Sequence, residues 1–518
     1  MGLRGAAATS HPLSTAIAIE TLRHGGNAVD AAVTACILQS VLEPHNTGLG
    51  GDCFALVWKA RERRLYALNG AGAAPQGLSD RWLLDQGIDA IGNEDVHAVT
   101  VPGALDAWQR LLADHGTLTL ARAFEPAIDY AQHGFVLAER AAADWAVEAT
   151  KLARDPGARA HFLRADGSAP RAGEVVKLPA LARTMQRIAE GGVDAFYRGD
   201  LAATLVATLQ AMGGRHARAD FAEHASRYVE PLRTTYRGVE LVQLPPSSHG
   251  LTALVMLNIL ARFDHRGFDP AGADRFHLQA EASRLAYRVR DTFVADPAYA
   301  EVPVAELLSD RYTDRLAERV ALDRALPHDF ALPAVSQRDT VYLTVVDADG
   351  NACSLISSLF YAFGSGRVCP QTGIALHNRG AGFRVQPGHP NSVQPGKRPL
   401  HTIIPAMALR DGQPVLSFGV MGGPYQPVGV VHVLQNIVDF GMDVQQALDA
   451  PRGFHQGGVF EAERGIADPV LQSLTARGHR VARSALPLGG GQVVAIDPAS
   501  GVLRAGSDPR KDGSALGY

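Results

Sequence analysis

Residues 339–351 read Asp-Thr-Val-Tyr-Leu-Thr-Val-Val-Asp-Ala-Asp-Gly-Asn, and this stretch decides how the rest of the chain is interpreted. The apolar run that starts at Thr340 predicts a β-strand, the segment Asp-Ala-Asp-Gly-Asn predicts a turn, and residues 352–359 predict a returning strand. Cleavage of the bond between Asp339 and Thr340 would place a hydroxyl nucleophile and a free α-amine on one residue. Such a residue can carry out acyl transfer without a separate base, which makes Thr340 a candidate nucleophile.

The composition indicates a globular protein with a substantial core. The chain has 518 residues, 46% of them hydrophobic and 20% charged, which is enough for one large or two ordinary domains. Its formal net charge is -4 and it has no sustained basic block, so nucleic acid and anionic membrane surfaces are poor candidate partners. The spacing of the four cysteines indicates neither a disulfide framework nor a zinc site, and we expect reduced thiols at Cys36, Cys53, Cys353 and Cys369.

The N-terminus carries one positive charge but lacks the apolar core of a secretory signal. No run of about 18 apolar residues occurs in the sequence, so we expect no transmembrane helix. These two observations predict a cytoplasmic protein.

The predicted elements change from helices to strands at Thr340. Two alanine-rich helices are expected first, one over residues 12–23 and one that begins after an N-cap at Asn27. Residues 76–240 are expected to be mainly helical, and residues 326–339, with two prolines and no period, are expected to form an exposed connector. Further strands are predicted at 54–58, 65–68, 341–346, 352–359, 374–376, 404–409 and 415–420, and further helices at 105–112, 121–133, 178–189, 251–262, 276–289, 428–440 and 444–448.

The first two strands after residue 339 are apolar on both faces rather than strictly alternating. This pattern is typical of a sheet that is covered on both sides. Together with the helical segments it predicts an α+β fold in which a sheet lies between helical layers.

Several common catalytic signatures are absent. The sequence has no G-x-S-x-G nucleophile elbow, no H-E-x-x-H motif and no Walker loop. Residues 48–53 (Gly-Leu-Gly-Gly-Asp-Cys) approach a dinucleotide fingerprint, but cysteine stands in place of the last glycine and a helix precedes the segment. A tight, glycine-dependent turn is the better interpretation.

Ordered motifs along nearly the whole chain resemble those of the γ-glutamyltransferase (γ-glutamyltranspeptidase) family of N-terminal-nucleophile hydrolases. The similarity runs from Ala8 to Tyr518. It is carried by residues 10–12, 25–32, 43–45, 48–51, 339–340, 345–352, 363–366, 373–374, 396–399, 422–423, 450–452 and 517–518. The resemblance implies the four-layer αββα sandwich of these hydrolases.

The resemblance also implies a precursor that cleaves itself. Thr340 would attack the carbonyl of Asp339, giving a large subunit of residues 1–339 and a small subunit of residues 340–518 that stay together as a heterodimer. Thr340 would then attack a small-molecule amide while its own α-amine moves the proton. The family implies no cofactor and no metal.

Two further roles are implied by similarity. Gly422 and Gly423 would supply backbone N–H groups to the oxyanion, and Ser358 would support the nucleophilic threonine. A turn that merely needs two glycines and an ordinary strand serine are the alternatives.

The predicted donor pocket departs from the family pattern. Where typical members have an arginine for the α-carboxylate of the γ-glutamyl group this chain has Ala71, and where they have an aspartate for the α-amino group it has Gly382. The family's asparagine after the supporting hydroxyl is Phe360 here, and its Ser-Ser pair is His401 and Thr402. Each lost charge-assisted hydrogen bond is worth roughly 1.5–3 kcal/mol, so γ-glutamyl recognition is expected to be weaker.

Arg379 could replace the missing groups, because its guanidinium can hold a carboxylate with two hydrogen bonds; a surface arginine in a loop is the alternative. We therefore expect retained catalytic machinery with a changed donor, bound by Arg379, His401 and Thr402. The donor would be a small carboxylated amide, either a γ-glutamyl amide such as glutathione or an acyl amide of the kind cleaved by cephalosporin acylases or oxamate amidohydrolases. Hydrolysis is preferred over transfer, because no acceptor site is identified.

Two competing functions are less well supported, because the set Asp339-Thr340, Ser358 and Gly422-Gly423 is intact and the sequence has no nucleophile elbow. A non-catalytic binding protein could keep the fold after its pocket had decayed, and it would remain a single uncut chain. A serine hydrolase that uses Ser365 would keep its activity after Thr340→Ala.

Overall fold

The hairpin predicted after residue 339 lies at the centre of a β-sheet. Its strands are β9 (Val341–Asp347) and β10 (Ala352–Ser358), which pair antiparallel. The carboxylate of Asp347 closes the turn between them, because it accepts the backbone N–H groups of Asp349 and Asn351 at 3.0 and 2.9 Å.

The computed structural model describes residues 1–265, 267–327 and 340–518. Asp339 and all but the first two residues of the predicted connector lie outside the described residues.

The hairpin belongs to a seven-stranded sheet with the order β20-β1-β9-β10-β2-β3-β6. The two ends of the chain meet in it, because β1 lies between β9 and β20 and is antiparallel to both. The other strands are β1 (Gly5–Thr9), β2 (Asp52–Lys59), β3 (Arg64–Gly70), β6 (Arg227–Val229) and β20 (Ser514–Gly517).

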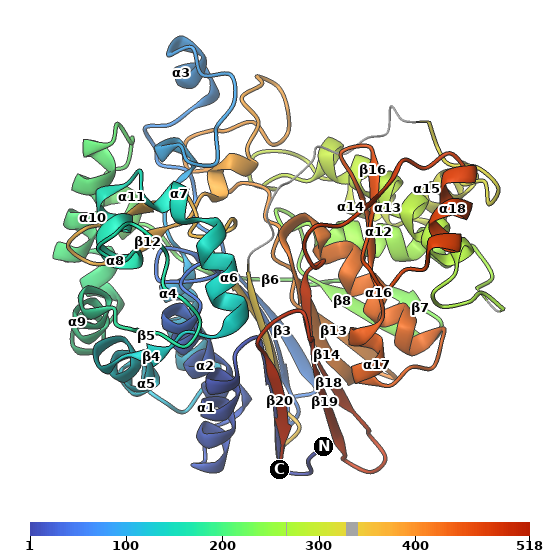
Figure 1. Ribbon diagram of the computed structural model, residues 1–518, viewed down its shortest axis with the longest axis horizontal. Helices are drawn as coiled ribbons and strands as arrows, with labels where there is room; N and C mark the ends of the chain where they lie inside the picture. The colour runs from blue at the N-terminus through green and yellow to red at the C-terminus, as the bar shows by residue number, and fades with distance from the viewer. Residues whose placement is uncertain (266, 328–339) are drawn as a thin grey trace.

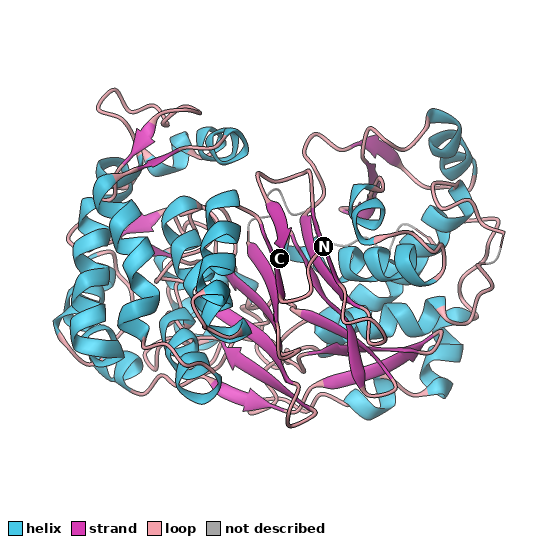
Figure 2. Cartoon of the chain, turned by 90° about the horizontal axis from the view of Figure 1, so that it is seen from below, coloured by secondary structure: helices cyan, strands magenta, loops and turns pink. Residues whose placement is uncertain are grey.

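A second sheet of six strands has the order β19-β18-β14-β13-β8-β7, and all its pairings are antiparallel. The two sheets lie face to face, as Figures 1 and 2 show. Its strands are β7 (Leu232–Tyr236), β8 (Val239–Gln243), β13 (Ala406–Arg410), β14 (Gln413–Met421), β18 (Gly490–Ile496) and β19 (Leu503–Ser507).

Helices cover the outer face of each sheet, which completes four layers (Figure 1). The hydrophobic core is accordingly divided into three main clusters, one under each helical layer and one between the sheets. The first helical layer contains α1 (Pro12–Arg23), α2 (Ala28–Leu42), α4 (Ala104–His115), α5 (Leu120–His133), α9 (Pro179–Tyr197) and α10 (Asp200–Ala211). The second contains α12 (Gly250–Leu260), α13 (Ala273–Phe293), α16 (Gln426–Val438) and α17 (Val444–Asp449). The predicted α+β, four-layer αββα fold is confirmed.

Shorter elements complete the described part of the chain. The helices are α3 (Asp80–Asp85), α6 (Glu139–Val147), α7 (Ala149–Leu152), α8 (Pro156–Phe162), α11 (Arg218–Ala222), α14 (Val304–Leu307), α15 (Asp310–Ala317) and α18 (Asp468–Ala476). The strands are β4 (Phe135–Val136), β5 (Val175–Val176), β11 (Arg367–Val368), β12 (Ala375–Leu376), β15 (Gly453–Gln456), β16 (Val459–Ala462) and β17 (Val481–Arg483).

One prediction about the large segment was wrong and another was incomplete. The chain opens on strand β1, not on a helix, although alanine has a low intrinsic preference for strands. Full burial between β9 and β20 overrides that preference. The region 76–240 is mainly helical as far as Ala222, but β6, β7 and the first two residues of β8 also fall within it and belong to the two sheets.

All four cysteines are buried and free of disulfides. Among the described residues, no helix is both long and apolar enough to cross a membrane.

Candidate active site

Strand register brings three polar residues together at one end of the first sheet. Ser358 ends β10 and pairs with Asp52, which begins β2. On the other side of β10, Ser357 pairs with Val341, so the next pair along the ladder is Ser358 and Thr340. Thr340, Ser358 and Asp52 therefore lie side by side on three neighbouring strands.

These three residues face the space between the two sheets. Residues two positions apart in a strand point to the same side. Two positions further along the three strands stand Tyr342, Ile356 and Phe54, all of which belong to the core between the sheets. The candidate site thus lies at one end of the inter-sheet space.

The hydroxyl groups of Thr340 and Ser358 are in hydrogen-bond contact. Their Oγ1 and Oγ atoms are 3.1 Å apart, and both residues are buried. Ser358 Oγ also accepts the backbone N–H of Phe360 at 2.8 Å, which fixes the orientation of the serine side chain. The arrangement can hold a hydroxyl nucleophile in one position while a neighbouring hydroxyl exchanges a hydrogen bond with it.

The Gly422-Gly423 turn lies toward the same end of the inter-sheet space. Thr344 of β9 donates a hydrogen bond to Ser417 of β14 at 2.6 Å, and the Tyr342 ring packs against Gly419. The end of β9 next to Thr340 therefore faces the end of β14 next to Gly422. The turn follows β14 directly and precedes α16, and both glycines have positive φ angles, 122° and 53°.

Arg379 is completely buried in a short 3-10 turn, which rules out a surface role. Its guanidinium lies over the ring of Phe360, 4.4 Å from the ring centre, and Nη1 donates to Oγ1 of Thr402 at 2.8 Å. Burial lowers the pKa of Arg379 to about 10, with Asp52 opposing the shift, so it remains protonated near neutral pH. In the described part of the chain its Nε and Nη2 atoms have no hydrogen-bond partner.

Asp52 is the centre of a buried polar cluster. Its Oδ1 accepts the backbone N–H groups of Gly72 and Gly103 at 3.0 and 3.1 Å. Its Oδ2 lies 2.8 Å from Nε2 of His401 and 3.3 Å from Nδ1 of His377. Burial alone would raise the pKa of Asp52, but the two histidines outweigh burial and hold that pKa well below its usual range.

The sequence interpretation missed Asp52 and His377 as site residues. The available signal was an aspartate at the entry to a continuously apolar strand, a position at which a carboxylate is buried and needs partners. Their partners come from segments 20 to 349 positions away, so spacing along the sequence could not identify them.

Comparison with known proteins decides the family. The model of the family described as gamma-glutamyltranspeptidase matches residues 14–518. The chain belongs to the γ-glutamyltranspeptidase family. It is accordingly an enzyme with the fold of N-terminal-nucleophile hydrolases, made as a proenzyme.

Members of the γ-glutamyltranspeptidase family that resemble this chain carry different names. It is 36% identical to the glutathione hydrolase-like YwrD proenzyme of Bacillus subtilis, over 100% of this chain and 99% of that protein. It is 33% identical to the oxamate amidohydrolase proenzyme of Klebsiella pneumoniae, over 99% of this chain and 98% of that one. The crystal structure of cephalosporin acylase from Bacillus halodurans superposes with a TM-score of 0.93 at 37% identity, covering 100% of this chain and 96% of that chain.

Packed, uncharged residues occupy the two positions at which the γ-glutamyltranspeptidase pattern has charged donor-binding residues. Ala71 is buried in the core between the sheets, and its carbonyl accepts a hydrogen bond from Nε of Arg398 at 3.0 Å. The carbonyl of Gly382 accepts one from Asn391 at 2.7 Å. The charged side chains beside these positions are Arg398, which contacts Ala71, and Arg379, which begins the 3-10 turn that ends at Gly382.

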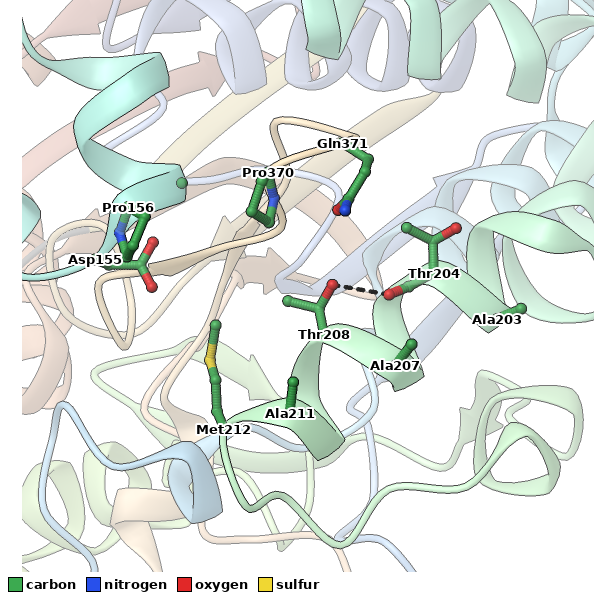
Figure 3. Close-up of a pocket in the computed structure, with 11 residues that line it drawn as sticks. Asp155, Pro156, Ala203, Thr204, Ala207, Thr208, Ala211, Met212, Pro370 and Gln371 are labelled. Atoms are coloured by element: carbon green, nitrogen blue, oxygen red, sulfur yellow. Dashed lines mark hydrogen bonds between the residues drawn. The ribbon is translucent and has the colours of Figure 1, made fainter.

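A separate cavity of about 660 Å³ lies on the first helical layer, between α8, α10 and Pro370 (Figure 3). None of its lining residues belongs to the site described above. Its walls are mainly apolar side chains and two threonines of α10.

Proposed function

We propose that this family member is a self-processing amidohydrolase with Thr340 as its nucleophile. The contact between Thr340 Oγ1 and Ser358 Oγ, at the end of the inter-sheet space, carries the proposal. In the first step Thr340 Oγ1 attacks the carbonyl carbon of Asp339. An ester bond forms while the peptide C–N bond breaks, and water then hydrolyses the ester to leave a carboxyl group on Asp339 and a free α-amine on Thr340.

The mature enzyme uses the same hydroxyl on an external amide. The α-amine, with a reference pKa of about 8, takes the proton of Thr340 Oγ1 as it attacks the donor carbonyl. Backbone N–H groups of Gly422 and Gly423 stabilise the tetrahedral oxyanion. The proton passes to the leaving amine, and water releases the acyl group from Thr340.

The donor proposed here is a small amide that bears a carboxylate on its acyl side. Arg379 supports this choice, because a buried guanidinium with two nitrogens that form no hydrogen bond within the described residues fits an incoming carboxylate. Thr402 orients the guanidinium through Nη1, while His401 acts through Asp52. Three similar proteins also support the choice of an amide donor, since they are named as glutathione hydrolase-like, oxamate amidohydrolase and cephalosporin acylase proteins.

The two products of self-cleavage would stay associated. Residues 1–339 supply β1, β2, β3 and β6 to the first sheet and β7 and β8 to the second, while residues 340–518 supply the other strands. Strand β1 of the large subunit is hydrogen-bonded on both sides by strands of the small one. Separation therefore requires both sheets to be dismantled.

Intact-mass measurement of the purified protein tests the proposal. The wild type should give two fragments that correspond to residues 1–339 and 340–518, whereas Thr340→Ala should remain one chain without amidase activity. Thr340→Ser is the matched control, because it keeps a hydroxyl, and it should be cut at the same bond. An uncut and inactive wild type would instead support a binding protein, and an active Thr340→Ala would support a serine nucleophile.

A further inference from the structure

The contact between His401 and Asp52 requires one proton more than a neutral histidine beside an ionised aspartate provides. Nδ1 of His401 lies 2.9 Å from the carbonyl oxygen of Pro399. A carbonyl can only accept, so the hydrogen of a neutral His401 ring must be on Nδ1. Nε2 then presents a lone pair to Oδ2 of Asp52 at 2.8 Å. Two lone pairs repel at this distance, so one additional proton must lie between the nitrogen and the oxygen.

His377 increases the need for that proton. Its Nε2 lies 2.9 Å from the carbonyl oxygen and 3.0 Å from the hydroxyl oxygen of Thr100. The hydroxyl can accept as well as donate but the carbonyl can only accept, so the hydrogen of a neutral ring is on Nε2. Its Nδ1 lone pair then faces the same Oδ2 of Asp52 at 3.3 Å. The other carboxylate oxygen already accepts two backbone N–H groups, those of Gly72 and Gly103.

The net charge of the Asp52–His401 pair is the same whichever of the two residues holds the proton. Asp52 with a neutral His401 carries one negative charge, and with the additional proton the pair carries none. This count holds for an imidazolium beside a carboxylate and for a neutral ring beside a carboxylic acid, because the proton belongs to the pair.

The net charge of the Asp52–His401 pair decides whether the positive charge of Arg379 is compensated. Its Nε lies 4.0 Å from Oδ2 of Asp52, and a simple interpretation would make Asp52 its counter-ion. If the Asp52–His401 pair is neutral, the buried guanidinium keeps an uncompensated positive charge. Such a charge is costly in a buried site unless an anion joins it.

A bound metal ion is not the better explanation of this cluster. Metal ligands converge on a common point, and no group of three His, Cys, Asp or Glu side chains within residues 1–265, 267–327 and 340–518 has that arrangement. The 2.8 Å separation is that of a direct hydrogen bond between His401 and Asp52.

We infer that Asp52 and His401 share one proton, and that this neutral pair leaves Arg379 free to bind the carboxylate of the acyl donor. The two residues are positioning residues that determine donor specificity through Arg379. The inference rests on the proposed function and adds to it the device that keeps the pocket cationic.

Two substitutions and their combination test the inference. His401→Gln removes the group that shares the proton, so Asp52 becomes a full negative charge and neutralises Arg379. Asp52→Asn keeps the Gly72 and Gly103 hydrogen bonds on its oxygen and can donate from its amide to a neutral His401. The double variant has no carboxylate and leaves Arg379 positive again.

The readout is the ratio of kcat/KM for two p-nitroanilides, glutaryl and valeryl, which have acyl chains of equal carbon number and differ in the terminal carboxylate. His401→Gln should lower the glutaryl-to-valeryl ratio roughly ten- to hundredfold, through the KM of the glutaryl donor, since that is the loss of a charge-assisted hydrogen bond. The double variant should restore the ratio to within about twofold of Asp52→Asn alone. Calorimetric titration of the same variants with glutarate compares their affinities for a carboxylate without turnover. If His401→Gln fails to fold, His401→Asn takes its place.

Three results would overturn the inference: an unchanged ratio in His401→Gln, a double variant as impaired as His401→Gln, or a ratio that rises in Asp52→Asn because a counter-ion has been lost. Failure of the proposed function has a different signature. A wild type that is uncut, or that shows no preference for the glutaryl donor, contradicts the nucleophile or the donor class before any variant is measured.

Discussion

The reacting end and the donor side of the site are built in different ways. Thr340 and Ser358 are placed by the register of two antiparallel strands, and the Gly422-Gly423 turn follows a strand of the facing sheet directly. Arg379, by contrast, lies in a short 3-10 turn, and His401 lies outside the strands and forms an isolated β-bridge with Ser248. A sheet fixes its residues through many backbone hydrogen bonds, whereas loops accept substitutions at lower cost. The reaction can therefore be retained while the donor changes.

After the loss of Thr340 itself, the largest effect on the reacting end is expected from Gly422→Ala. A Cβ atom there would stand 2.9 Å from Cα of Gly489, and a φ angle of 122° is strained for any residue with a side chain. The turn must shift, and its N–H groups then miss the oxyanion, so kcat should fall about 10²–10³-fold. Steady-state kinetics with the glutaryl anilide measures this effect.

Gly423→Ala is the matched control for that variant. Apart from its two neighbours in the chain, no atom of the described residues lies within 4 Å of a Cβ placed at residue 423, and its φ of 53° is one that alanine can adopt for about 1–2 kcal/mol. Its kcat should be closer to that of the wild type than the kcat of Gly422→Ala. Equal losses in the two variants would show that the turn is needed for folding and not for oxyanion binding.

Ser358→Ala should have the next largest effect. It removes the hydroxyl that contacts Thr340 Oγ1 and leaves the Phe360 N–H without its acceptor. We expect self-cleavage to slow and kcat to fall about 10²-fold, the usual range for a group that assists proton transfer. The time course of fragment formation on a denaturing gel measures the rate of self-cleavage, and Ser358→Thr is the hydroxyl-bearing control. Wild-type cleavage and turnover in Ser358→Ala would reduce Ser358 to an ordinary strand residue.

Arg379→Met is expected to act on the donor side alone. Methionine can still pack over Phe360, but it cannot hold a carboxylate, so KM for the glutaryl donor should rise roughly ten- to hundredfold. The valeryl donor should be affected much less. If both donors lose activity equally, Arg379 supports the fold of the site and does not select its ligand.

Phe360→Leu should give the smallest effect. The aromatic ring stabilises the guanidinium above it, and a cation–ring interaction is worth about 0.5–1 kcal/mol at exposed sites and about 2 kcal/mol when desolvated, or roughly two- to thirtyfold in KM. KM for the glutaryl anilide measures it. An effect larger than that of Arg379→Met would show that the ring contacts the donor directly.

The sequence predicted the elements whose signals are local. The helix over residues 12–23 has the predicted bounds, and Asn27 caps α2 as expected. The β9–β10 hairpin was likewise readable, because a turn sequence separates two apolar runs. These features depend on residues a few positions apart.

Features that depend on distant segments were not predictable in this way. Strand β1 is a strand because β20, about 500 residues away, and β9 enclose it, and its alanines carry no signal of their own. Asp52 and His401 meet across 349 positions, and the need for a shared proton follows only from the Pro399 carbonyl on the far side of the ring. The sequence identified Arg379 as a candidate, but only the structure shows that it is buried.

One comparison of two donors tests most directly whether the reaction has been retained while the donor has changed. Glutaryl p-nitroanilide and γ-glutamyl p-nitroanilide differ only by the α-amino group of the latter. Gly382 offers this amine no carboxylate, and Arg379 repels it, so the wild-type kcat/KM should be higher for the glutaryl donor by about tenfold or more. A kcat/KM that is higher for the γ-glutamyl donor would contradict the account.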